Sequence, residues 1–113
     1  MNPAGARAEE LCERLLARAG LRVLARNWRC RFGEIDLIAE ERGTVVFVEV
    51  RYRSGAMFGG AGESITAAKR ARVAAAARAW LAGRPEAPCR FDVLLVESAA
   101  GDRIRWIRDA FEG

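Results

Sequence analysis

Charged residues lie two positions apart in each of two neighbouring segments of this chain. Glu34 and Asp36 lie two residues apart, and Glu49 lies two residues before Arg51. If both segments are strands, side chains two positions apart share one face of the sheet. Carboxylates gathered on one face are oxygen ligands of the kind that Mg²⁺ takes, together with water and phosphate oxygens. One hypothesis from this spacing is therefore that the carboxylates of the two segments bind a divalent metal ion.

The loop between the two segments determines which residues oppose each other. Residues 41–44 (ERGT) include a glycine, which accepts the positive φ of a tight hairpin. If this loop has four residues, residue 40 pairs with residue 45, and Asp36 lies directly opposite Glu49. Directly opposed Cβ atoms lie about 4.5–5.5 Å apart, and like charges at that distance destabilise a sheet. The hairpin thus predicts a carboxylate pair that needs a positive partner.

Two partners for this pair remain open. Val45 and Phe47 share the face of Glu49, so the pair is expected near the core, where an uncompensated charge is costly. The compensating group is either Arg51, in a structural ion pair, or a bound cation. Both alternatives depend on the hairpin register, because a shift of one residue would separate the two carboxylates.

Hydrophobic periodicity places the other elements around these two strands. The pattern predicts helices over residues 7–19 and 67–82, the second with Thr66 as its N-cap. The order α-β-β-β-α-β-β predicts a single α/β domain over residues 1–113, with a central mixed sheet flanked by helices. Strands are predicted over residues 21–31, 34–40, 45–52, 90–97 and 103–107, and one helical turn over 109–111.

Composition excludes several classes of site. The chain has no histidine, which removes Ser-His-Asp and Cys-His catalysis and histidine-ligated zinc. Its three cysteines form no CxxC pair, so they are expected to be buried thiols and not zinc ligands or disulfides. Because no apolar stretch reaches 18 residues and no secretory signal is present, we expect a cytoplasmic protein without a membrane partner. The net charge of +4 suits a polyanion.

Two segments carry a family resemblance. GEIDLIA (33–39) and VFVEVRYR (46–53) together resemble the signature of the YraN-like family, bacterial proteins predicted to be endonucleases and similar to archaeal Holliday junction resolvases. The resemblance implies the restriction-endonuclease-like fold of the PD-(D/E)xK nucleases. Further family-like segments run along nearly the whole chain: AEEL (8–11), ARNWRCR (25–31), FGG (58–60), ITAAK (65–69), CRFDV (89–93) and DAF (109–111).

The resemblance implies a catalytic metal site. In that fold an Asp of the second strand and a Glu of the third bind Mg²⁺ or Mn²⁺, and these match Asp36 and Glu49. A glutamate of the first helix often completes the site, which matches Glu9. Arg51 stands where the superfamily has lysine; it stays protonated, so it stabilises charge but cannot act as the base. Lys69, the one lysine of the chain, is either the missing ammonium or part of a solvated helix face.

Basic residues near the second helix suit a nucleic-acid backbone. Arg53, Lys69, Arg70 and Arg72 are expected to contact DNA phosphates without reading sequence. Glu34 and Thr66 are expected to support the site from just outside the ligands.

Three functions follow from this resemblance. The first is a metal-dependent DNA endonuclease, with branched or junction DNA as one candidate substrate. The second is a nucleic-acid-binding module of the same fold with weak or lost catalysis. The third is a nuclease subunit that needs a partner or a homodimer, since resolvases cut as two-fold dimers.

Overall fold

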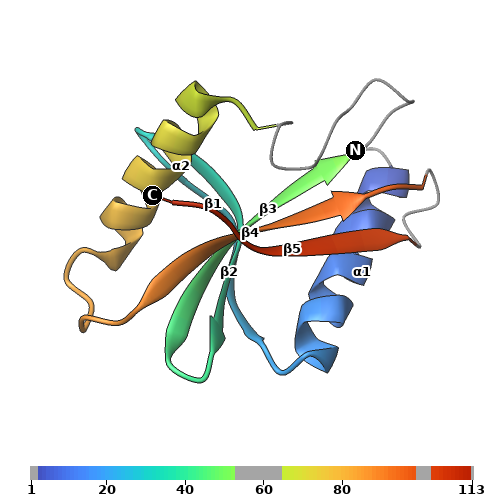
Figure 1. The fold of residues 1–113 in the computed structure, drawn as a ribbon, viewed down its shortest axis with the longest axis horizontal. Coiled ribbons are helices and arrows are strands. Elements are labelled where there is room, and N and C mark those ends of the chain that lie inside the picture. Colours follow the sequence, from blue (N-terminus) through green and yellow to red (C-terminus); the bar gives the residue numbers. More distant parts are fainter. Residues whose placement is uncertain (1–2, 53–64, 99–102, 113) are drawn as a thin grey trace.

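Five strands form one sheet, and one helix lies on each of its faces (Figure 1). The computed structural model describes residues 3–52, 65–98 and 103–112, so Arg53 and the rest of the glycine-rich segment 53–64 lie outside the described part. Within it, no helix combines the length and the apolar composition that crossing a membrane requires. The predicted order of elements is confirmed: α1 (Pro3–Arg18), β1 (Arg22–Cys30), β2 (Gly33–Glu41), β3 (Thr44–Tyr52), α2 (Ala67–Leu81), β4 (Cys89–Val96) and β5 (Ile104–Phe111).

The strands lie in the sheet in their order along the chain, β1-β2-β3-β4-β5. All neighbours are antiparallel except β3 and β4, which are parallel, so the predicted mixed sheet is confirmed. Parallel neighbours need a crossover connection, and α2 provides it. Since β4 starts opposite Val45 at the beginning of β3, the chain must return along the sheet between these two strands, and α2 lies within this return.

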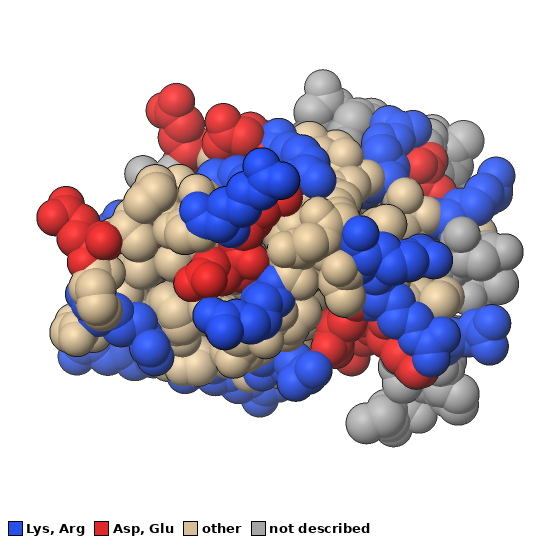
Figure 2. Space-filling model, turned by 90° about the horizontal axis from the view of Figure 1, so that it is seen from below, with Lys and Arg blue, Asp and Glu red and all other residues tan. Residues whose placement is uncertain are grey.

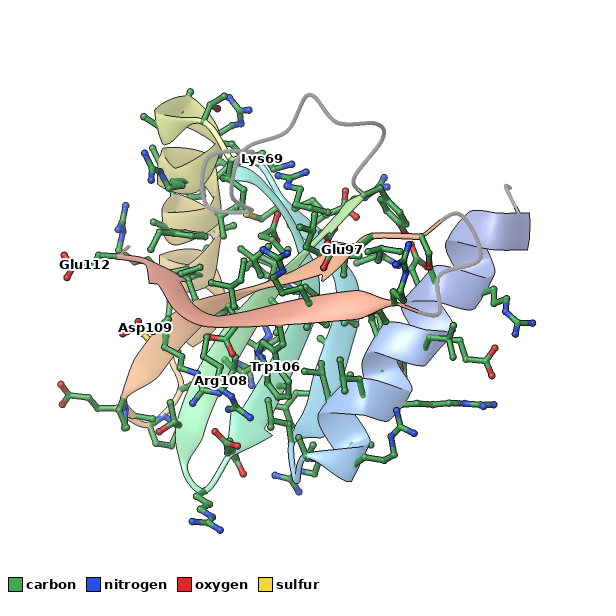
Figure 3. The ribbon with its side chains drawn as sticks, turned by 45° about the vertical axis from the view of Figure 1, so that its right-hand side comes forward. Lys69, Glu97, Trp106, Arg108, Asp109 and Glu112 are labelled. Atoms are coloured by element: carbon green, nitrogen blue, oxygen red, sulfur yellow. The ribbon has the colours of Figure 1, made fainter. Side chains whose placement is uncertain are left out.

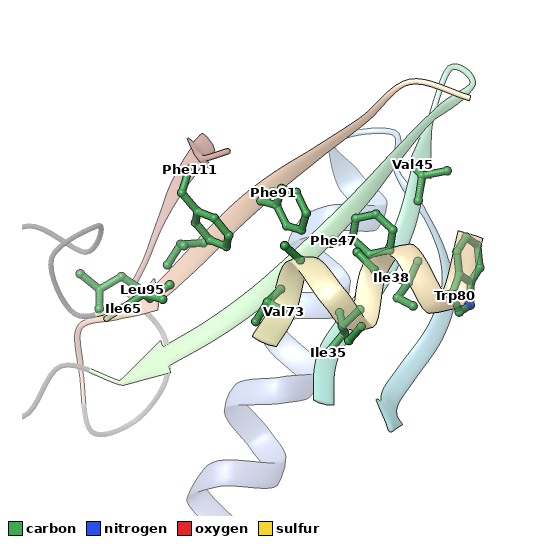
Figure 4. Packing of buried hydrophobic residues seen from close by; sticks show 14 residues of the cluster. Ile35, Ile38, Val45, Phe47, Ile65, Val73, Trp80, Phe91, Leu95 and Phe111 are labelled. Carbon is green, nitrogen blue, oxygen red and sulfur yellow. The ribbon is translucent and has the colours of Figure 1, made fainter. Parts of the chain in front are cut away.

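Helix α2 packs on one face through small and aromatic side chains. Helical spacing predicts that Val73, Ala77, Trp80 and Leu81 face inward; the first three are buried and Leu81 is half-buried. The Trp80 ring meets Phe47 of β3 edge-on, with 6.0 Å between centroids, and Phe47 stacks on Phe91 of β4 at 5.4 Å (Figure 4). Such pairs add to the free energy gained by burial. This face is thus held together across three elements.

Helix α1 covers the opposite face. Its buried residues Ala8, Cys12 and Leu16 recur at intervals of four and pack against Leu37 and other residues of the central strands. The helix begins at Pro3, four residues earlier than predicted. Cys12 is buried as expected and Cys30 is partly so, but the expectation is wrong for the third cysteine, Cys89, which is exposed.

The end of the chain corrects a prediction. Residues 109–111 do not form a helical turn, because β5 continues to Phe111. Asp109 adopts a left-handed φ of 51°, and the register between β4 and β5 shifts there. Beyond this irregularity the Phe111 ring stacks on Phe91 at 5.0 Å, so burial of the ring holds the segment in the sheet.

A buried carboxylate holds this irregular strand in place. Asp92 of β4 is fully buried and accepts hydrogen bonds from Arg90 Nε (3.0 Å), Trp106 Nε1 (3.0 Å) and the backbone N–H of Asp109 (2.8 Å). Arg90 also donates to Glu41 of β2 at 2.9 Å. Figure 2, which views the end of the molecule that carries the β2–β3 turn, shows carboxylates enclosed by basic side chains. Because donors surround it, this buried charge is compensated.

Replacing Asp92 by alanine should therefore destabilise the fold strongly. Removing one partner of a buried ion pair leaves the other uncompensated and costs about 3–5 kcal/mol. Urea denaturation measures this loss. Glu10→Ala is the matched control: its ion pair with Arg14 is exposed, so its loss should cost less than about 1 kcal/mol. Equal losses in the two variants would contradict the structural role of Asp92.

Candidate metal and phosphate site

The hairpin between β2 and β3 has the predicted register. Glu40 pairs with Val45, and the pairing continues inward at the same offset, so Asp36 lies opposite Glu49. The turn itself is shorter than predicted. Only residues 42–43 remain outside the ladder, and both have positive φ, as the commonest two-residue hairpin turn requires.

The ladder opens where the two carboxylates meet. Its last backbone pair is Leu37 with Val48. Beyond it, the N–H of Asp36 donates to Oε2 of Glu49 at 3.3 Å, and the N–H of Val50 donates to Oδ2 of Asp36 at 2.8 Å. Each carboxylate thus accepts from the opposite strand a hydrogen bond that a backbone carbonyl would accept in a regular ladder. The predicted juxtaposition of the two acids is therefore found, in a gap of the sheet.

The alternation of faces changes at Asp36. Ile35 and Ile38 both pack against the α2 side of the sheet, whereas Leu37 packs against the α1 side. Strict alternation would place Ile35 and Leu37 together, so the argument that put Glu34 and Asp36 on one face does not hold here. Glu34 forms an ion pair with Arg29 at 3.5 Å. Its negative charge also raises the pKa of Asp36, so it lies close enough to the pair to act on it.

Asn27 of β1 is a residue that sequence reasoning missed. It lies between the pairs Arg26–Leu37 and Trp28–Ile35, which places it opposite Asp36, and it has a left-handed φ of 47°. Asparagine is one of the few residues that adopt this conformation readily. The sequence signal for this irregular backbone was an asparagine inside a strand pattern.

A pocket of about 80 Å³ opens beside Asp36. Glu9, the predicted third ligand, lies in its wall, so α1 does bring this side chain to the site. The described residues contain no group of three His, Cys, Asp or Glu side chains in metal-binding geometry. Asp36 and Glu49 therefore form a pair, with Glu9 as a neighbour across the pocket. The lining residues are Glu9, Glu13, Arg26, Asn27, Asp36, Leu37, Val50 and Tyr52.

Burial perturbs both acids of the pair. It raises the pKa of Glu49 from 4.5 to about 7, and the negative charge of Asp36 adds to the rise. Burial also raises the pKa of Asp36, while the hydrogen bond from Val50 opposes the rise. Two cations, Arg51 and Lys69, lower the pKa of both carboxyl groups. The pair is therefore short of positive charge in the free protein.

Arg51 supplies part of that charge. Its Nη2 lies 3.8 Å from Oε1 of Glu49, while its buried Nε has no hydrogen-bond partner among the described residues. The predicted ion pair therefore exists, but with loose geometry. This single long contact is compatible with both alternatives, a structural ion pair with Arg51 and a bound metal cation.

The other cation comes from α2. Thr66 caps this helix and accepts a hydrogen bond from the N–H of Lys69 at 3.1 Å, so it fixes the first turn that carries this lysine. Figure 3 shows Lys69 on the first turn of α2. Of the four predicted phosphate contacts, Lys69, Arg70 and Arg72 lie on the amino-terminal half of α2, and Arg53 lies outside the described residues. Lys69 and Arg70 are half-buried and Arg72 is exposed.

The donor set fits a hard divalent cation. No described residue donates a hydrogen bond to Oδ1 of Asp36, and the contact that the described residues make with Oε1 of Glu49 is the long one from Arg51. Mg²⁺ is commonly bound by one or two carboxylates, with water and phosphate oxygens completing its coordination. Asp36 and Glu49 are two such carboxylates, and their negative charges are only partly compensated by nearby cations.

The raised pKa of Glu49 predicts a pH-dependent stability. A carboxyl group whose pKa is higher in the folded state loses stability as pH rises from 4.5 to about 7. Without metal, Glu49→Gln should therefore be more stable than the wild type at pH 8, by up to about 3 kcal/mol, and similar to it at pH 4. Urea denaturation in EDTA at both pH values measures this. The same difference at pH 4 and pH 8 would refute the raised pKa.

Removing the Lys69 charge should raise the pKa of Glu49 further. Lys69→Met is expected to raise it because the Lys69 cation lowers this pKa, and carbon-detected NMR of the glutamate carboxyl groups follows the titration. Arg78→Met is the matched control, since Arg78 lies in the last turn of the same helix. An equal rise in the pKa of Glu49 in both variants would mean that this pKa responds to the net charge of the protein and not to the position of Lys69.

Comparison with known proteins gives the chain a family. Residues 8–96 match the uncharacterised protein family UPF0102. A UPF0102 protein of Methylobacillus flagellatus is 53% identical over 111 residues, covering 98% of each chain. One from Nitrosomonas europaea is 51% identical over 96% of this chain and 92% of its own. One from Pseudomonas entomophila is 47% identical over 96% and 93%. The chain therefore belongs to the uncharacterised protein family UPF0102.

Proposed function

We propose that this chain is a metal-dependent DNA endonuclease with a restriction-endonuclease-like fold. The observation that carries the proposal is the carboxylate pair in the opened β2–β3 ladder. Asp36 and Glu49 lie in a gap of the sheet and are short of positive charge, and Asp36 borders the pocket that Glu9 also lines. The resemblance of the two strand motifs to PD-(D/E)xK nucleases supports the same assignment.

Each residue of the site has a role in phosphodiester hydrolysis. Asp36 and Glu49 would hold Mg²⁺ or Mn²⁺, with Glu9 as the third ligand. A bound metal polarises the phosphate and lowers the pKa of its water. Arg51, which stays protonated, stabilises the negative charge that develops on the phosphate. Arg51 cannot accept a proton from the attacking water. The ammonium of Lys69 would give the site a second cation, of a different kind from the guanidinium.

The start of α2 is the proposed contact for the DNA backbone. Lys69, Arg70 and Arg72 lie within its first two turns, and the N-terminus of a helix attracts phosphate through its free N–H groups. Arg53, which precedes this helix, is proposed to act with them. Contacts of this kind hold the DNA backbone without reading the base sequence. A branched substrate would therefore be recognised by its shape and not by its sequence.

A binding module without catalysis is the second candidate. The contact between Arg51 and Glu49 favours it, because this ion pair compensates one of the carboxylates without a metal. The proposal of a homodimer or a partner subunit rests on the resemblance to resolvases alone.

Cleavage assays test the proposed activity. With Mg²⁺ or Mn²⁺, the protein should cut duplex, flap or four-way junction DNA. Asp36→Ala and Glu49→Ala should each lower the rate by roughly a hundredfold or more, because the metal contributes several kcal/mol to catalysis. Glu10→Ala, on the outer side of α1, is the matched control and should leave the rate unchanged.

The same assay separates the two candidate functions. DNA binding without cleavage by any metal, unchanged in both alanine variants, would favour the binding module and reject the metal site. Arg51→Lys gives a further test, since lysine is the residue of the superfamily motif. If Arg51 limits turnover, this variant should cleave faster than the wild type.

A further inference from the structure

The turn between β1 and β2 presents an aromatic ring at its tip. Phe32 is one of the large apolar side chains that remain exposed, with 40% of its surface accessible. The guanidinium of Arg31 lies over the ring, with its Cζ 4.8 Å from the ring centroid. A single exposed apolar residue is ordinary. Its position and neighbours make this one notable.

The tip lies against the basic start of α2. A Cβ built on Gly33 would lie 3.5 Å from the Cβ of Arg72, so the turn and the helix are in direct contact. Figure 1 shows the β1–β2 turn beside the first half of α2. Lys69 lies one helical turn before Arg72, towards the N-terminus. An aromatic ring and several cations therefore share one end of the molecule.

The carboxylate pair lies within reach of this tip. Asp36 follows Phe32 by four residues, and a strand rises about 3.3 Å per residue, so the two lie roughly 13 Å apart along the chain. Stacked bases are spaced about 3.4 Å apart along a strand, so this distance corresponds to roughly four nucleotides. A strand cut at the carboxylates would pass the aromatic tip.

We propose that Phe32, backed by Arg31, is a stacking platform for an unpaired base of the substrate strand. Aromatic rings stack on any base but need one that is not paired inside a duplex. The cations of α2 hold the phosphates of the same strand. This inference rests on the proposed function, and it specifies the substrate class: DNA with a single-stranded segment close to the scissile bond, such as a flap or fork.

Binding measurements in the absence of cleavage test this platform. Fluorescence anisotropy of the full chain in EDTA would compare labelled single-stranded, forked and fully duplex oligonucleotides of equal length. Phe32→Ala should weaken binding to the first two by about 5- to 100-fold and leave duplex binding unchanged. Phe32→Trp should retain or improve it. Leu24→Ala is the matched control, since Leu24 is 38% exposed on the same strand pair.

The outcomes are distinguishable. A selective loss in Phe32→Ala, with thermal unfolding like that of the wild type, supports the platform. Equal loss on all three DNAs, or none, overturns it while leaving the proposed nuclease intact. If the wild type binds none of the oligonucleotides, both the platform and the proposed function fail.

Discussion

The sheet is interrupted where Asp36 and Glu49 meet, and hydrogen bonds from backbone to carboxylate close the gap. A regular ladder would be more stable here, because two buried acids repel each other and lose hydration. The backbone N–H groups of Asp36 and Val50 offset part of this cost, and the raised pKa of Glu49 shows that part remains. The proposed activity depends on this residual need for positive charge.

A second buried carboxylate shows what complete compensation looks like. Asp92 accepts hydrogen bonds from a guanidinium, an indole and a backbone N–H, and it holds the irregular end of β5. Asp36 accepts one hydrogen bond from described residues, and the cations that lower its pKa belong to the neighbouring strand and to α2. Burial alone therefore does not distinguish a structural acid from a candidate ligand. The number of donors around it does.

Positive charge reaches the pair from two elements. Arg51 lies on the strand of Glu49 and contributes a loose ion pair, whereas Lys69 is carried in by α2. The parallel crossover from β3 to β4 makes this possible, because it returns the chain through a helix whose first half contacts the start of β2. The same arrangement places the β1–β2 turn with Phe32 beside the basic start of α2. One end of the sheet thus gathers acids, cations and an aromatic ring.

Much of this protein was predictable from local sequence. Alternation and helical spacing predicted the element order, and the hairpin predicted that Asp36 opposes Glu49, because both follow from short-range geometry. The opened ladder and the strand that carries Phe111 were decided by tertiary structure alone, and the left-handed Asn27 was signalled in the sequence only by its residue type. Each breaks a regular period, and a residue leaves its period only when contacts with distant elements outweigh local preference. Such contacts arise only in the folded chain.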